Sequence, residues 1–132
     1  MVINLSGELI PDDWAELYRA WGYSAGFFCP SDLRKAMAEL PEGEELVLEI
    51  NSVGGSVDGG AEIYSLIQAC KNPTRAVIQS MAASAASYMI MACDAIDICL
   101  PAQMMIHCAW GGGAGNQYEH QQMAQALGVC DE

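Results

Sequence analysis

Basic residues are scarce in this chain of 132 residues, which has five lysines and arginines against 17 aspartates and glutamates. The formal net charge at pH 7 is therefore −12. Nucleic-acid backbones and anionic membranes are bound through a basic face, so the charge balance argues against nucleic acid and membrane as partners. The densest acidic run, from Glu39 to Glu49, is interpreted as a solvated loop.

Several other patterns are missing. The six cysteines form no C-x-x-C pair and the two histidines complete no tetrahedral ligand set, so we expect neither a metal nor a cofactor. Cysteines inside apolar runs, with no basic, apolar signal segment at the start, favour a cytoplasmic protein. The uncharged run 76–93 is interrupted by Gln79, Ser80, Ser84 and Ser87, so it is not expected to span a membrane.

What the chain does contain is an alternation of strand and helix patterns, which predicts a single α/β domain over residues 1–132 with a sheet of right-handed βαβ units. Strands are expected at 2–9, 45–51, 75–80, 95–100 and 103–107, and helices at 11–23, 31–40, 58–71, 82–93 and from about Asn116. In the helix at 31–40, Ser31 or Asp32 is expected to cap the start, and Leu33, Met37 and Leu40 share one face.

Functional groups in such folds gather where strands end, and three places qualify. Gly54-Gly55 follows a strand but matches neither a dinucleotide fingerprint nor a phosphate-binding loop, so it is either a plain tight turn or a site of amides for an oxyanion. Ser84 stands among alanines at the start of a predicted helix. It is either a nucleophile or a small residue that allows close packing. His107 precedes a glycine-rich turn. It is either the base that activates Ser84 or a structural histidine.

Other candidates for the base are weaker. His120 lies in a polar helix and is expected to be solvated. Lys35 and Lys71 lie on a helix surface and after a helix end, which disfavours a Ser–Lys dyad.

Taken together, "EINSVGGSVDGGAEIY", "MAASAAS" and "MMIHCAWGG" resemble the proteolytic subunit of Clp protease, and most closely the Clp-like head-maturation (prohead) proteases of phages and prophages. The motifs occur in the family's order, with 29 residues from Gly55 to Ser84 and 23 from Ser84 to His107. The resemblance implies a ClpP/crotonase-like fold of stacked ββα units whose C-terminal part is missing.

The resemblance also implies a serine endopeptidase with Ser84 as nucleophile, His107 as general base, and the amides of Gly55 and Ala85 as oxyanion hole. Gly54, Gly112 and Gly113 are the residues expected to bind substrate. It implies a peptide or protein substrate, here a phage scaffold or capsid precursor, a homo-oligomeric ring in the full-length protein, and an ATP-dependent unfoldase as a further partner.

Three positions depart from the family pattern. Val53 replaces a proline, Ser80 replaces a glycine, and the family's catalytic aspartate, which lies well downstream of the histidine, has no counterpart. Asp94 and Asp97 precede His107 and are interpreted as loop or strand-edge acids. The chain is therefore expected to be an N-terminal fragment or a weakly active remnant that forms incomplete rings or none. An inactive assembly module and a crotonase-type acyl-CoA enzyme are the alternatives.

Overall fold

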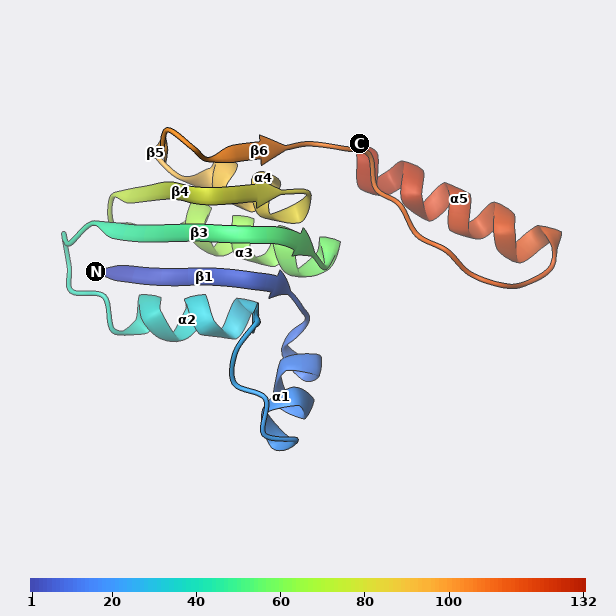
Figure 1. The fold of residues 1–132 in the computed structure, drawn as a ribbon, viewed down its shortest axis with the longest axis horizontal. Coiled ribbons are helices and arrows are strands. Elements are labelled where there is room, and N and C mark those ends of the chain that lie inside the picture. Colours follow the sequence, from blue (N-terminus) through green and yellow to red (C-terminus); the bar gives the residue numbers. More distant parts are fainter.

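The computed structural model describes residues 1–132 and shows a parallel sheet with helices between its strands (Figure 1). In chain order the elements are β1 (Val2–Leu9), α1 (Asp12–Ala20), β2 (Phe27–Phe28), α2 (Pro30–Ala38), β3 (Leu46–Gly55), α3 (Val57–Ala69), β4 (Thr74–Ala83), α4 (Ala85–Met89), a 3-10 turn (Ile90–Ala92), β5 (Ala95–Ile98), β6 (Gln103–Met105) and α5 (Gln117–Asp131). The predicted α/β alternation is confirmed, and β2 is the strand that the sequence analysis missed.

The strand order is β2-β1-β3-β4-β5, and every pairing is parallel. The first half of β4 pairs with β5, and its last three residues pair with β6. Because the strands are parallel, β1, β3 and β4 have their C-terminal ends at the same end of the sheet, on the right in Figure 1. Of the three candidate positions, Ser84 and His107 follow strands that end here, whereas Gly54 and Gly55 are the last residues of β3, which runs beyond the predicted end at residue 51.

The hydrophobic core lies against one face of the sheet. Alternate side chains of β3 are fully buried there, and they pack with apolar side chains of α2, α3 and α4. These core residues include Leu46, Leu48, Ile50, Leu33, Ile63, Ile67, Ala86 and Met89. The other face carries polar pairs: Asn4 donates to Glu49 across β1 and β3, and the Ser80 hydroxyl donates to Asn51 across β3 and β4. Burial of one face per strand is what fixes the register of the sheet.

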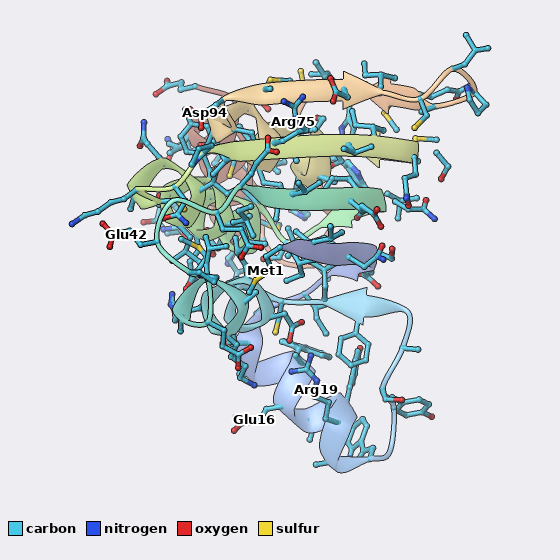
Figure 2. The ribbon with its side chains drawn as sticks, turned by 90° about the vertical axis from the view of Figure 1, so that its left-hand side faces the viewer. Met1, Glu16, Arg19, Glu42, Arg75 and Asp94 are labelled. Atoms are coloured by element: carbon cyan, nitrogen blue, oxygen red, sulfur yellow. The ribbon has the colours of Figure 1, made fainter.

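The start of α2 differs from the prediction. Its N-cap is Cys29, whose N–H donates to Asp32 Oδ2 at 3.0 Å, and neither Ser31 nor Asp32 is the cap. Pro30 takes the first helical position, which its fixed φ suits, so the helix begins before the predicted residue. Asp32 also forms an ion pair with Arg19 of α1 at 2.8 Å. Figure 2 labels Arg19, which lies on the side of α1 toward the sheet.

The boundaries near the candidate site also differ. The helix expected at 82–93 begins at Ala85, because β4 continues to Ala83 and there pairs with β6. The strand expected at 103–107 ends at Met105, so His107 follows the strand and does not end it.

The last helix begins as expected, with the Asn116 side chain accepting from the Glu119 N–H at 3.0 Å. No residue of α5 is buried, and Figure 1 shows this helix beyond the edge of the sheet. None of the helices combines the length and the apolar character that crossing a membrane requires.

Candidate active site

Ser84 lies at the corner between β4 and α4, in a backbone conformation that residues other than glycine rarely adopt. Its φ is 56° and its ψ is −128°, and it is the only residue other than glycine with a positive φ. The Ser84 N–H donates to the Met105 carbonyl of β6 at 2.8 Å, and the Ser84 carbonyl accepts from the Ser87 hydroxyl at 2.6 Å. Such strain persists where surrounding contacts enforce it, and it clusters at functional sites.

The glycine pair comes from the end of the neighbouring strand, β3. A Cβ on Gly54 would lie 2.6 Å from the Ala83 carbonyl oxygen, 2.8 Å from Ser84 Cβ and 2.9 Å from the Ala85 nitrogen. The backbone of Gly54 therefore packs directly on the corner that carries Ser84. A Cβ on Gly55 would meet the Leu9 carbonyl oxygen at 2.1 Å. Both positions require glycine because there is no room for a side chain.

A buried serine holds this turn in place. The Ser52 hydroxyl donates to the Gly7 carbonyl at 2.6 Å and accepts from the Gly54 N–H at 3.0 Å. The N–H of Ala85, at the first position of α4, has no acceptor within its own helix. The corner thus combines a serine, a closely packed glycine turn and the start of a helix.

His107 lies in the segment that follows β6, and its side chain is exposed. Its ring Nδ1 is hydrogen-bonded to the Cys108 carbonyl oxygen. Since a carbonyl can only accept, Nδ1 is the donor in this contact, and in the tautomer that carries its proton on Nδ1 the Nε2 atom is an acceptor. No hydrogen bond joins this ring to the Ser84 hydroxyl.

One cavity of about 360 Å³ brings these groups together. Ser84, His107, Gly54 and Gly55 all line it. The remaining lining residues are Glu8, Val53, Val57, Met105, Ala109 and Trp110. Ala85 is in contact range of Gly54 without lining the cavity.

Gly112 and Gly113 lie elsewhere. They line a second cavity, of about 490 Å³, formed with α5 and including His120. The structure therefore does not bring these two glycines to Ser84, because the chain turns along α5 after Trp110. His120 is exposed, as expected.

The two aspartates between Ser84 and His107 are structural. Asp94 accepts from the Thr74 N–H at 2.8 Å and Asp97 pairs with Arg75 at 2.8 Å, both at the beginning of β4. Figure 2 views the sheet from the ends where its strands begin and shows Arg75 and Asp94 there. Ser84 follows the other end of this ten-residue strand, about 30 Å away at ~3.3 Å per residue. Neither aspartate can orient His107.

The sequence profile of the Clp protease family matches residues 35–131. The chain belongs to the Clp protease family. The solved structure of a ClpP1 mutant from Listeria monocytogenes is similar, with a TM-score of 0.69 and 20% sequence identity. The match covers 99% of this chain and 66% of that one, and at this identity it shows the shared fold.

These findings confirm the family and the ClpP-like fold that the motifs predicted. The phage head-maturation subtype and the roles of individual Clp-family residues stay predictions. Three residues of the site had not been singled out, namely Ser52, Ser87 and Glu8. The alternation of β3 could have indicated Ser52, since it continues the buried positions Leu48 and Ile50 with a polar side chain.

Proposed function

We propose that this protein is a serine endopeptidase in which Ser84 is the nucleophile and His107 the general base. The observation that carries the proposal is the strained φ of Ser84 at a strand-to-helix corner, inside a cavity shared with His107 and the glycine turn. A serine on such a corner exposes its hydroxyl to a bound substrate.

In the proposed reaction, Ser84 Oγ attacks the carbonyl carbon of the scissile peptide bond and His107 Nε2 takes the hydroxyl proton. The N–H groups of Gly55 and Ala85 hold the oxyanion of the tetrahedral intermediate. Its collapse breaks the C–N bond as His107 returns the proton to the leaving amine. Water then hydrolyses the acyl-enzyme by the same steps, with His107 again as base.

The Cys108 carbonyl supports this assignment in the absence of an aspartate. It accepts from Nδ1, which leaves Nε2 free to accept the serine proton, and this is the tautomer that catalysis needs. A neutral carbonyl stabilises the imidazolium less than a carboxylate does, so the described residues alone are expected to act slowly. Catalytic hydrogen bonds often tighten only with substrate bound, and the His107 ring is expected to approach Ser84 then.

For the substrate we propose a protein chain, and the resemblance to head-maturation proteases favours a phage scaffold or capsid precursor in the host cytoplasm. An assembly of several copies is supported by α5, which buries no side chain against the sheet. Delivery of substrate by an ATP-dependent unfoldase belongs to the same proposal and rests on the family resemblance.

The test is labelling with a fluorophosphonate, which phosphonylates an activated serine. The protein is compared with Ser84→Ala and with Ser65→Ala, a control on the exposed face of α3. We expect Ser65→Ala to label like the unmodified protein and Ser84→Ala not to label. Equal labelling of Ser84→Ala would refute Ser84 as the nucleophile. No labelling of a folded protein would refute the peptidase and favour an inactive assembly module.

A further inference from the structure

The cavity beside Ser84 has a charged wall that the proposed reaction does not use. Glu8 is the only carboxylate among its lining residues, and no lysine or arginine lines it. The carboxylate is in none of the five ion pairs of the structure. Glu8 is exposed and lines the cavity that a substrate would enter.

The backbone holds Glu8 firmly in this position. Its N–H donates to the Gly26 carbonyl at 3.0 Å, and its register partners are Phe27 on one side and Gly54 on the other. The register between β1 and β3 shifts between Ser6 and Glu8, where the extra residue belongs to β3, and the alternation of β1 continues through Glu8. Glu8 therefore lies on the same exposed face of β1 as Asn4 and Ser6, and it pairs with Gly54 at the cavity.

The distance between Glu8 and Ser84 suits a substrate side chain. The strands that carry them are separated by β3 alone, so the two residues lie about 10 Å apart at ~4.8 Å per strand. A lysine or arginine next to the scissile bond, together with the glutamate side chain, spans this gap. An acidic side chain would instead meet a carboxylate in a protein of net charge −12.

An aromatic ring completes the subsite. Trp110 lines the same cavity and is 82% exposed, so its face is free to contact a bound group. Indole faces attract ammonium and guanidinium groups. We propose that Glu8 and Trp110 form a subsite for a lysine or arginine side chain adjacent to the bond that Ser84 cleaves. The inference rests on the proposed function and names its substrate class.

The test uses a pair of peptidyl diphenyl phosphonates that carry either lysine or norleucine beside the reactive phosphorus. In each, Ser84 Oγ would bond to phosphorus and displace phenol, so the rate of labelling reports binding beside the nucleophile. Norleucine has the lysine chain without the ammonium group. We expect the lysine probe to react about tenfold faster with the unmodified protein.

The variant Glu8→Gln should bring this rate ratio close to one, whereas Glu16→Gln should leave it unchanged. Glu16 is an exposed carboxylate on α1, pointing away from the sheet in Figure 2, and the substitution removes the same charge. High salt should also lower the ratio for the unmodified protein, because it screens the carboxylate.

The outcomes separate the two proposals. The subsite is overturned if the fluorophosphonate labels Ser84 but the lysine and norleucine probes react at equal rates. It is also overturned if the faster reaction of the lysine probe survives Glu8→Gln. Both results leave the peptidase standing. An equal slowing of both probes by Glu8→Gln also overturns it, since that result assigns Glu8 to the catalytic groups. A folded protein that no probe labels at Ser84 overturns both proposals.

Discussion

Replacing Gly54 with alanine is the sharpest perturbation of the site, because it adds one methyl group where three groups of the nucleophile's corner already lie. The φ of Gly54 is +91°, in the region that favours glycine. The new Cβ would be 2.6 Å from the Ala83 carbonyl oxygen, where ordinary contact begins at 3.4 Å. The turn and the corner must therefore separate by about 0.8 Å.

The cost follows from two terms. The left-handed backbone costs an alanine about 1–2 kcal/mol, and forcing a methyl group into a packed contact costs a further ~1–3 kcal/mol. Gly22 provides a matched control, since its φ is +90° and a Cβ there has no neighbour within 4 Å. The free energy of unfolding of Gly22→Ala should fall only by the cost of the left-handed backbone. The difference between the two variants isolates the clash with the corner.

Two measurements test this reasoning. Denaturant unfolding should show Gly54→Ala to be less stable than Gly22→Ala by about 1–3 kcal/mol. Fluorophosphonate labelling of the folded protein should fall about 100-fold in Gly54→Ala, because a displacement near 1 Å misaligns the oxyanion site, and should not change in Gly22→Ala. Equal stability of the variants, with labelling of Gly54→Ala at the unmodified rate, would refute the close packing.

Two further predictions concern other hydroxyl and thiol groups. Ser87→Ala removes the hydroxyl that donates to the Ser84 carbonyl. Denaturant titrations should show a free energy of unfolding that is lower by about 1 kcal/mol. Ser65→Ala removes an exposed hydrogen bond and should lower the free energy of unfolding less. Burial raises the pKa of both Cys29 and Cys93 to about 11, so alkylation at pH 8 followed by mass spectrometry should modify these two after the exposed thiols; modification at the same rate as Cys99 would contradict this.

The sequence predicted the architecture well because the patterns that determine it are local. The alternation of β3 and the helical spacing of Ile63 and Ile67 both mark residues that are buried in the core. The element boundaries were less accurate where tertiary contacts decide them. β4 extends to Ala83 because β6 pairs with its end, and a pairing partner 22 residues away leaves no local signal.

The candidate site shows the same division. Ser84, His107 and the glycine pair were named from motifs, and the structure brings them to one cavity. The positions of Gly112 and Gly113 could not be inferred, because the path of an irregular glycine-rich segment depends on what it packs against. Glu8 was missed for another reason: it reaches the cavity because β1 pairs with the end of β3, and a pairing between Glu8 and Gly54, 46 residues apart, leaves no local signal.

The role of His107 can be separated from that of histidine in general, since the chain has two histidines and they line different cavities. His107→Ala removes the acceptor for the Ser84 proton, so fluorophosphonate labelling should slow by at least ~100-fold, the lower end of what general-base catalysis contributes. His120→Ala should label at the unmodified rate. If His107→Ala also labels at that rate, the reactive serine does not depend on this ring, and the Cys108 carbonyl orients a histidine that takes no part in the reaction.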